Sequence, residues 1–374
     1  MTVSYRALRY PDVSSLAPEE LSEAETNWVH FQPYLLSKGY QLRPRYRPGW
    51  QPSWKSTGAK PYDCEDSYDS LPLRALDAVR VIDDLQVMIK MIIPYDDDQE
   101  GEDELKILEY LSSEQCAADP ANHAVRCLES FPMPEVERGA FCVMPLLMVY
   151  NNPPFDSLGE IYDLLKQLFE GLQFLHKNNI AHCDISPPNI MMDGRLLYDQ
   201  PFDANLQTLP SSYRKIALPK YQRSQRPVRY YYIDFGYAKW FQDPTQTHVV
   251  QGIHARERAP EQLEGLYDPF KADIYQLGAI MRRDLIPSYP SLGSLLPLAR
   301  QMTRHDPQRR PSLEVASRIM SAQFAGLSGW RMRWPILLRD ASFGEKCTSM
   351  VIGVTAEIAF LLRRTFELLL VGWS

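Results

Sequence analysis

The sequence lacks features that mark several common classes of protein, and each missing feature argues against one of these classes. Its six cysteines show no CxxC spacing, which argues against a zinc site or a disulfide framework and indicates a reducing compartment. Basic residues are in deficit, with a net charge of −7 at pH 7, whereas nucleic-acid-binding proteins usually carry a basic excess. Residues 1–15 lack the apolar run of a signal peptide. We therefore expect a cytoplasmic protein that does not bind nucleic acid.

What the chain does contain is the composition of a globular protein. Of its 374 residues, 45% are hydrophobic and 23% charged, which suffices for one two-lobed domain or for two domains. Residues 1–74 form a polar, aromatic and proline-rich extension, in which residues 18–34 favour a helix. Three prolines within residues 40–54 exclude a regular helix there. We interpret this stretch as a linker or as a strap over the next domain.

The next segment, residues 75–147, predicts a small β-rich lobe. Residues 78–93 indicate two strands, separated by a turn at Asp83 and Asp84. Apolar residues alternate on both sides of that turn, with Lys90 at the opposite phase to the second set: Val79 and Val81, then Val87, Ile89 and Met91. A helix should follow, because Leu105, Leu108 and Leu111 have helical spacing. Residues 141–150 then predict a third strand, which should be buried.

Residues 148–325 predict a larger, helical lobe. Ser157 and Glu160 form a capping box at the start of a helix that should extend to about Lys177. Its apolar stripe comprises Ile161, Leu164, Leu165, Leu168, Leu172 and Leu175. A proline-rich and basic insert occupies residues 194–228, and a final helical set runs over residues 260–325.

The pattern that carries the chemistry lies on either side of that insert. AHCDISPPNIMMD, residues 181–193, places Asp184 before Asn189, and YYIDFG places Asp234 at the end of a β-branched and aromatic run. An aspartate that orients a hydroxyl, with an asparagine and an aspartate that hold Mg²⁺, is the minimal equipment for moving a phosphoryl group from ATP. The sequence therefore predicts phosphoryl transfer.

These motifs resemble the eukaryotic protein-kinase fold over residues 75–325. VMIK, which ends at Lys90, and ELKIL, which follows Asp103, are similar to the lysine strand and the glutamate helix of that family. HCDISPPN resembles its catalytic loop, and DFG resembles its magnesium motif. Three later features also match the family: Ala259-Pro260-Glu261, the helix aspartate Asp273, and Arg310 as the partner of Glu261. The YYIDFG motif, the insert and the extension with RPRYRPGW look most like those of kinase-like proteins of fungi.

The resemblance implies a two-lobed α+β fold with ATP and Mg²⁺ as cofactors and the nucleotide between the lobes. Lys90 would contact the α- and β-phosphates, and Glu104 would fix that lysine. Asp234 would ligate Mg²⁺, Asn189 would hold a second Mg²⁺, and Asp184 would accept the proton of the substrate hydroxyl. The acceptor would be a protein, on serine or threonine by default. The oligomeric state stays open.

Other residues of these motifs are expected to be structural. His182 should hold the catalytic loop rather than act as a base or a ligand. Phe235 and Leu108 should be packing residues. Glu261 and Arg310 should form a buried ion pair, whose loss would strand a charge.

The sequence also departs from the family pattern. Only Gly49 and Gly58 lie between residues 40 and 89, so a glycine-rich loop that closes over the phosphates is missing, and ATP binding should be weaker. Residues 74–79 are our candidate for covering the nucleotide instead. Ser186 stands where serine/threonine kinases usually have a lysine that touches the γ-phosphate.

Two further positions bear on charge. One basic side chain of the insert could substitute for the missing lysine: Arg214, Lys215, Lys220 or Arg223. We favour the alternative that these residues form a solvated charge cluster on a loop. Cys183 replaces the arginine that in many kinases receives the phosphorylated activation loop. We therefore expect activity that does not depend on phosphorylation of Thr245 or Thr247.

The apolar tail, residues 326–374, has two interpretations. Four charged residues interrupt residues 351–374 and argue against a membrane span: Glu357, Arg363, Arg364 and Glu367. We favour a helix packed on the larger lobe. The alternative is an amphipathic helix in peripheral contact with a membrane surface or in a partner groove.

Two alternative functions stay open. The missing glycines favour a pseudokinase that scaffolds partners, whereas a scaffold would not need Lys90, Asp184, Asn189 and Asp234 together. A small-molecule phosphotransferase of the aminoglycoside or choline kind uses a similar catalytic loop. The Ala259-Pro260-Glu261 motif opposes that alternative, because it resembles a platform for peptide substrates.

Overall fold

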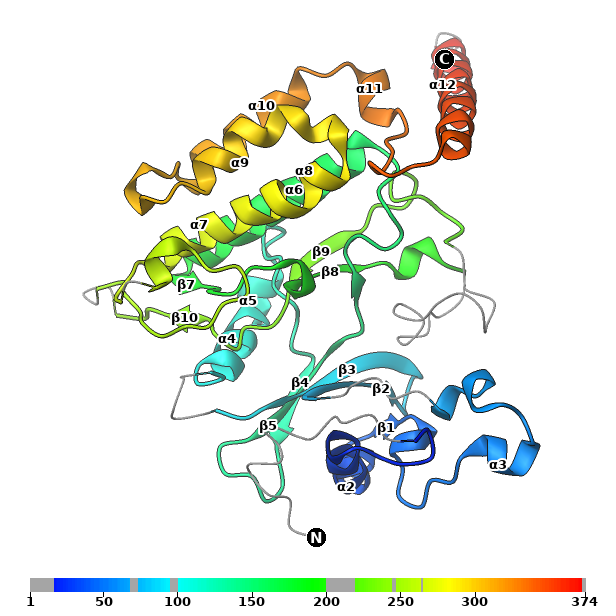
Figure 1. Cartoon of the computed structure of the whole chain (residues 1–374), viewed down its shortest axis with the longest axis vertical. Helices are drawn as coiled ribbons and strands as arrows, with labels where there is room; N and C mark the ends of the chain where they lie inside the picture. The colour runs from blue at the N-terminus through cyan, green and yellow to red at the C-terminus, as the bar shows by residue number, and fades with distance from the viewer. Residues whose placement is uncertain are drawn as a thin grey trace. The chain divides into compact units, whose positions relative to one another are not determined.

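The computed structural model in Figure 1 describes residues 17–67, 73–94, 100–199, 219–243, 247–263 and 265–371. Internal contacts divide these residues into two compact units. Unit 1 holds the described residues within Met1–Asp119, Ala124–Met148 and Asp193–Lys220, and unit 2 holds those within Pro120–His123, Val149–Met192 and Tyr221–Ser374. Unit 1 is built on an antiparallel sheet and unit 2 is largely helical, which confirms the expected two-lobed α+β fold class.

The sheet of unit 1 has the strand order β1-β2-β3-β5-β4. Its strands β1 to β5 are Tyr40–Leu42, Ala75–Arg80, Leu85–Ile92, Glu129–Pro132 and Ala140–Pro145. The two strands expected around Asp83 and Asp84 are therefore present. The turn between them places Asp84 at a φ of 55°, a left-handed conformation that aspartate tolerates better than most residues.

The buried face of β2 differs from the one that the alternation of Val79 and Val81 indicates. The register places Ala78 opposite Val87, and side chains that face one another across an antiparallel pair lie on the same side of the sheet. Ala78 is buried, whereas Val79 and Val81 are 37% and 54% exposed. The alternation of the second strand is confirmed by the buried set Val87, Ile89 and Met91.

The N-terminal extension, called the strap below, packs on this sheet and also joins it, because β1 within residues 40–54 pairs with β2 at the edge of the sheet. Its helix α2, Glu23–Ser37, begins later than expected, because Ser22 and Glu25 form a capping box. Trp28 and Phe31 are buried in one hydrophobic cluster with residues of β2, β3 and β5. The proline-rich stretch holds β1 and a short 3-10 helix, η1 (Pro44–Tyr46), before α3 (Ser53–Thr57), followed by η2 (Pro61–Asp63) and η3 (Glu65–Ser67).

A buried arginine anchors the strap. Arg45 Nε donates a hydrogen bond of 2.5 Å to Glu25 Oε1. Its Nη1 atom donates to the carbonyls of Pro18 and Asp66, at 2.7 and 3.0 Å, and its Nη2 atom donates to the carbonyl of Glu20 at 2.8 Å. The guanidinium is thus satisfied by groups that are distant in sequence, which fixes the path of the extension.

Two helices and a short 3-10 segment complete unit 1. They are α4 (Glu104–Leu111), α5 (Glu114–Ala117) and η5 (Arg195–Leu197). The expected helix is α4, and it buries Leu108 and Leu111, whereas Leu105 is only half-buried. Ile107 is buried instead of Leu105, so the inward face is rotated from the one that the leucine spacing indicates.

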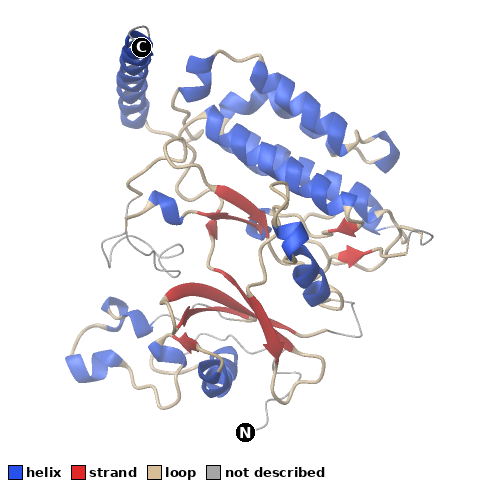
Figure 2. Ribbon diagram, turned by 180° about the vertical axis from the view of Figure 1, so that it is seen from behind, coloured by secondary structure: helices blue, strands red, loops and turns tan. Residues whose placement is uncertain are grey.

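The long helix of unit 2 is α6, Leu158–Lys177. The Ser157 side chain accepts from the Glu160 N–H, but the Glu160 carboxylate accepts from the Asp156 N–H, so only half of the predicted capping box forms. The predicted stripe is confirmed, because all six of its residues are buried: Ile161, Leu164, Leu165, Leu168, Leu172 and Leu175. Helix α6 contacts α10 (Leu313–Ala325) and β9 (Arg229–Tyr232), and Figure 2 shows the helices and strands of the protein from behind.

The remaining strands and helices place the loops of the candidate site. Short strands are β6 (Met148–Val149), β7 (Ile180–Ala181), β8 (Ile190–Asp193) and β10 (Lys239–Trp240), with the 3-10 helix η4 (Pro187–Asn189) between β7 and β8. The final helical set, as expected, runs from η7 (Pro260–Leu263) through α7 (Pro269–Ile280), η8 (Met281–Leu285), α8 (Ile286–Ser288), η9 (Pro290–Leu295), α9 (Leu296–Met302) and η10 (Pro307–Arg309) to α10, followed by α11 (Gly329–Arg333).

In the C-terminal tail, the short helix α11 is followed by a long helix, α12 (Phe343–Val371), which extends away from the other helices of unit 2 (Figure 1). The favoured packing on the larger lobe is wrong for the described residues of α12, because the only buried residue among them is Gly353, which has no side chain. Met350 and Leu362 are 65% and 67% exposed. In the described part of the chain, no helix is both long enough and apolar enough to cross a bilayer.

Candidate active site

The loop between β7 and η4 holds Asp184 and Asn189 together. The Asn189 side-chain amide donates to the Asp184 carboxylate at 2.9 Å and to the Asp184 carbonyl at 2.8 Å. The other carboxylate oxygen of Asp184 accepts from the Arg256 backbone N–H at 2.7 Å. Both carboxylate oxygens are therefore fixed, and Asp184 is only 5% exposed. An aspartate held in this way presents its carboxylate in one orientation.

A buried aspartate on α7 fixes the start of this loop. The Asp273 carboxylate accepts from the backbone N–H groups of His182 and Cys183 at 2.9 and 2.8 Å, and its Oδ2 lies 2.8 Å from His176 Nε2. Asp273 is 0% exposed, as expected for the helix aspartate. Cys183 has a φ of 67°, a left-handed conformation that is uncommon for cysteine, and these hydrogen bonds hold it there.

Two supports of the loop are absent from our sequence-based expectations. Gln276 accepts from the Ile185 N–H at 2.8 Å and donates to the Cys183 carbonyl at 2.9 Å. It lies one helical turn after Asp273, a spacing that could have indicated a second contact from the same face of α7. Arg256 acts through its backbone N–H, so its side-chain type carries no signal of that role.

The electrostatics of the site are set by burial and by a second carboxylate. Burial raises the pKa of the Asp184 carboxyl above its usual range, and the negative charge of Asp234 adds to that shift. The Arg256 N–H and the Asn189 amide oppose it, because they stabilise the ionised form. Asp234 itself is exposed and has a φ of 62°. Unit 2 therefore keeps two mutually repelling carboxylates near one another.

These side chains fit a magnesium site. Mg²⁺ prefers oxygen ligands and is usually held by one or two carboxylates together with substrate phosphates. Asp234 offers a carboxylate, and Asn189 uses its amide nitrogen for both of its hydrogen bonds, which leaves its amide oxygen as the ligand atom. The described residues contain no group of three or more His, Cys, Asp and Glu suited to a metal, so a cage made of protein alone is absent there.

The expected lysine–glutamate pair is present within unit 1. Lys90 Nζ on β3 lies 2.5 Å from Glu104 Oε1 on α4, and the two side chains are 14% and 4% exposed. The helix is also tied to the sheet by Ser130 Oγ, which donates to Glu109 Oε1 at 2.7 Å. The sheet and α4 therefore hold the lysine in a defined position, with its charge balanced by a nearly buried carboxylate.

The structural residues of these motifs behave as expected. His182 Nε2 lies 3.0 Å from the Ile233 carbonyl, and its ring packs against that of Phe235, tilted by 46° with the ring centres 4.9 Å apart, so it holds the loop. Phe235 and Leu108 are buried. The Arg310 guanidinium donates to both carboxylate oxygens of Glu261, at 2.5 and 2.6 Å, which confirms the predicted ion pair.

Two of the departures from the family pattern, residues 74–79 and Ser186, lie among the described residues. Residues 74–79, our candidate for covering the nucleotide, lie almost entirely in β2, which pairs with β3 along its length, so they form a sheet strand rather than a covering loop. Ser186 is fully buried, and its hydroxyl has no hydrogen-bond partner among the described residues. A buried hydroxyl without a partner is costly.

The basic residues of the insert divide into different roles. Lys220 pairs with Asp199 at 2.6 Å on the surface, as a solvated charge cluster predicts. Arg223 is buried instead, and it donates to the carbonyls of Pro153 and Tyr150 at 2.6 and 3.3 Å. It is therefore a structural residue and no substitute for the missing lysine. Arg214 and Lys215, like Thr245, lie outside the described residues, whereas Thr247 is exposed.

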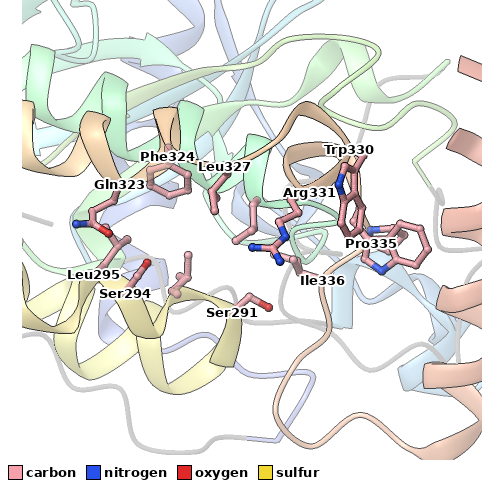
Figure 3. A pocket seen from close by; sticks show the side chains of 13 residues that line it. Ser291, Ser294, Leu295, Gln323, Phe324, Leu327, Trp330, Arg331, Pro335 and Ile336 are labelled. Atoms are coloured by element: carbon pink, nitrogen blue, oxygen red, sulfur yellow. The ribbon is translucent and has the colours of Figure 1, made fainter. Parts of the chain in front are cut away.

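Unit 2 also contains a pocket of about 550 Å³ (Figure 3). Its walls come from the start of α6, from η9, from the end of α10 and from α11 with the segment after it. Its lining residues include Leu295, Phe324, Leu327, Trp330, Arg331 and Ile336. None of the predicted phosphoryl-transfer residues lines it, so its chemistry is separate from that of the catalytic loop.

The sheet of unit 1, the helices of unit 2 and the geometry of the Asp184 loop define a protein-kinase-like fold. The family model described as the protein kinase domain matches residues 145–293. The curated relatives include the dual specificity protein kinase lkh1 of Schizosaccharomyces pombe, 30% identical over 142 residues, which are 37% of this chain and 18% of that protein. They also include the dual specificity protein kinase CLK1 of Mus musculus and of Homo sapiens, 24% and 25% identical, over 48% of this chain and 35% and 34% of those proteins. The chain thus aligns with about a third or less of the length of these relatives.

Proposed function

We propose that this protein is a protein kinase that uses ATP and Mg²⁺ to phosphorylate a hydroxyl of a protein substrate, on serine or threonine by default. The observation that carries the proposal is the fixed carboxylate of Asp184, held by the Asn189 amide at 2.9 Å and by the Arg256 N–H at 2.7 Å. The relatives are named as protein kinases, which favours a protein acceptor over a small molecule.

In this proposal Asp184 accepts the proton of the substrate hydroxyl. Its raised pKa makes the carboxylate a stronger base than an ordinary aspartate. Its two fixed oxygens keep the proton acceptor in place, so little reorganisation is needed when the hydroxyl attacks. Asn189 thereby has two roles, since its nitrogen orients Asp184 and its oxygen is offered to a metal ion.

Lys90, with Glu104, and Asp234 are assigned to the nucleotide. The Lys90 ammonium is the group that contacts phosphate oxygens, and Glu104 holds it in position through the 2.5 Å ion pair. Asp234 and Asn189 would hold magnesium, which when bound neutralises part of the charge of the triphosphate. The Ser186 hydroxyl is neutral and buried where other kinases present a lysine, so it brings no positive charge to the γ-phosphate.

A substitution at Asp184 tests the catalytic assignment. Asp184→Asn should lower phosphotransfer to a protein substrate by about 100- to 10,000-fold, the usual contribution of a general base, while Mg-ATP affinity measured by calorimetry stays close to that of the unmodified protein. Asp234→Asn should weaken Mg-ATP binding as well. The matched control is Asp340→Asn, an exposed aspartate outside the site, which should leave both quantities unchanged.

Two results would overturn this assignment. Full phosphotransfer by the Asp184→Asn variant would remove Asp184 from the mechanism. An unmodified protein that neither binds Mg-ATP nor transfers phosphate would favour the scaffold function, which the missing glycine loop supports. A phosphotransfer screen in which sugars or amino alcohols react faster than proteins would instead favour a small-molecule phosphotransferase.

A further inference from the structure

Two of the six cysteines lie in contact within unit 1. Cys142 Sγ on β5 and Cys127 Sγ, in the segment before β4, are 3.4 Å apart. The other four are separate: Cys116 and Cys183 are buried, Cys64 is half-buried, and Cys347 is exposed on α12. All six are free thiols in this structure. The 3.4 Å separation of the two sulfurs places them in contact, close to the geometry from which a disulfide can form.

This thiol pair lies beside the lysine of the candidate site. The register places Cys142 opposite Lys90 on β3 and opposite Ser130 on β4, so the three side chains share one face of the sheet. The same face carries the ion pair between Lys90 and Glu104. Cys127 is tied to the end of α4, because its backbone N–H donates to Ser112 Oγ at 2.7 Å.

The two thiols differ in a way that suits stepwise oxidation. Cys127 is half-buried, so a small oxidant can reach it, whereas Cys142 is 0% exposed. The Cys142 S–H donates to Cys127 Sγ, and this hydrogen bond lowers the pKa of the Cys127 thiol below its usual range against the opposing effects of burial, Glu109 and Glu129. The thiolate is the reactive form of cysteine, so Cys127 is the nucleophile of the pair.

We propose that Cys127 and Cys142 form a peroxide-reactive dithiol that closes reversibly to a disulfide beside Lys90. The Cys127 thiol loses its proton, and the thiolate attacks one oxygen of hydrogen peroxide. The O–O bond breaks, the thiolate becomes a sulfenic acid, and the hydroxide that leaves takes up the released proton to form water. Cys142 then loses its proton and attacks the Cys127 sulfur, the S–O bond breaks, and a second water leaves. Two thiols and one peroxide thus give one disulfide and two waters, and a thiol reductant reverses the change.

Treatment of the full-length protein with a few equivalents of hydrogen peroxide, followed by alkylation and peptide mapping without reductant, tests the proposal. We expect a single intramolecular link between Cys127 and Cys142, removed by dithiothreitol. The same treatment in urea should form this link at least about tenfold more slowly, because unfolding removes the proximity of the two sulfurs. Cys347→Ser is the matched control, since it removes an exposed thiol of α12 and should leave the link unchanged.

Variants of the pair separate the two roles. In Cys142→Ser the first step has no resolving thiol, so a dimedone adduct should accumulate at Cys127. In Cys127→Ser the buried Cys142 should remain unmodified over the same time. Absence of the link in the folded wild-type protein, or an adduct at Cys142 in Cys127→Ser, would overturn the proposal. This mapping needs no phosphotransfer, so it stands or falls independently of the proposed kinase activity.

A thermal measurement gives a second readout. The disulfide would close a loop between residues that are 15 positions apart, which restricts the unfolded chain. The oxidised protein should therefore unfold a few degrees higher than the reduced protein, and dithiothreitol should reverse this shift. Cys142→Ser should show no shift on oxidation. A midpoint that moves equally in wild type and Cys142→Ser would assign the effect to another thiol.

Discussion

At the scale of single residues, the candidate site depends on backbone groups as much as on side chains. Cys183 and Asp234 both have positive φ values, at 67° and 62°. Non-glycine residues adopt such conformations where surrounding contacts impose them. For Cys183 those contacts are the Asp273 carboxylate and the Gln276 side chain. Cys183 stands where many kinases have an arginine, and its partners on α7 keep it in position.

The raised pKa of Asp184 predicts how kcat/KM changes at low pH. A base must be ionised, so kcat/KM should fall as the pH drops through the pKa of Asp184, and a raised value places that fall at a higher pH than an ordinary aspartate would. A pH profile of kcat/KM, run beside circular dichroism to show that the fold is intact, measures this. A rate that stays constant down to the usual range of aspartate would contradict the assignment.

Sequence patterns located the motif residues but could not supply their partners. Asp184 and Asn189 stand out because they lie close together in one motif, Asp234 because it precedes Phe-Gly after a β-branched and aromatic run, and Lys90 because it interrupts an apolar alternation. Arg256 binds Asp184 only through its backbone, which any residue type could do. The basic neighbours of Arg223 in the sequence predict a solvated charge, yet Arg223 is buried against carbonyls of the segment 150–154. Burial of that kind depends on contacts 69 to 73 positions away.

At the scale of elements, the clearest example is α2. Its apolar pattern is weak and it contains Pro33, so the sequence indicated a helix without indicating what it packs on. Trp28 forms part of the unit 1 core and lies 6.3 Å from the Phe141 ring on β5. Long-range packing, rather than local periodicity, therefore decides the role of the extension. The same reason explains Val79, where register with β3 overrides local alternation.

Removing the Trp28 side chain should destabilise unit 1 strongly. Trp28 is 0% exposed, and truncation of a buried aromatic residue costs about 3–5 kcal/mol through lost burial and the cavity left behind. Urea unfolding of Trp28→Ala, followed by far-ultraviolet circular dichroism, should show a loss of that size. Leu36→Ala is the matched control on the same helix, because Leu36 is 46% exposed and its removal should change the unfolding free energy by less than about 1 kcal/mol. Equal effects of the two substitutions would contradict the packing of α2.

At the scale of the complete chain, the two units are each built from segments that are separated in the sequence. Each unit is assembled from three segments of the chain, so neither could be delimited by composition alone. The strap, the sheet and α4 build unit 1, whereas unit 2 buries its apolar residues around α6 and α7. The exception is α12, whose described apolar side chains are mostly exposed. Apolar composition predicted burial there, but burial needs a surface to pack on.

Truncation after Ser342, which removes α12, should therefore leave the rest of the protein folded. The described contacts of α12 are few: Arg333 pairs with Glu357 at 2.6 Å, and Arg333 lies 3.7 Å from the centre of the Phe360 ring. The ion pair is partly exposed and contributes about 0–1 kcal/mol, and the cation–π contact adds about 0.5–1 kcal/mol. The unfolding free energy from urea titration should fall by less than about 2 kcal/mol.

Gly353→Leu is the internal control for this truncation, because it weakens the contact of α12 without shortening the chain. A Cβ at Gly353 would lie 2.9 Å from Pro335 Cδ and 3.2 Å from the Trp334 ring, so a leucine there should push the helix away from α11. Both variants should then unfold at nearly the same urea concentration as the unmodified protein. A loss of cooperative unfolding in either variant would show that the exposed helix contributes to the core of unit 2, since a helix attached only by surface contacts can detach without exposing buried apolar residues.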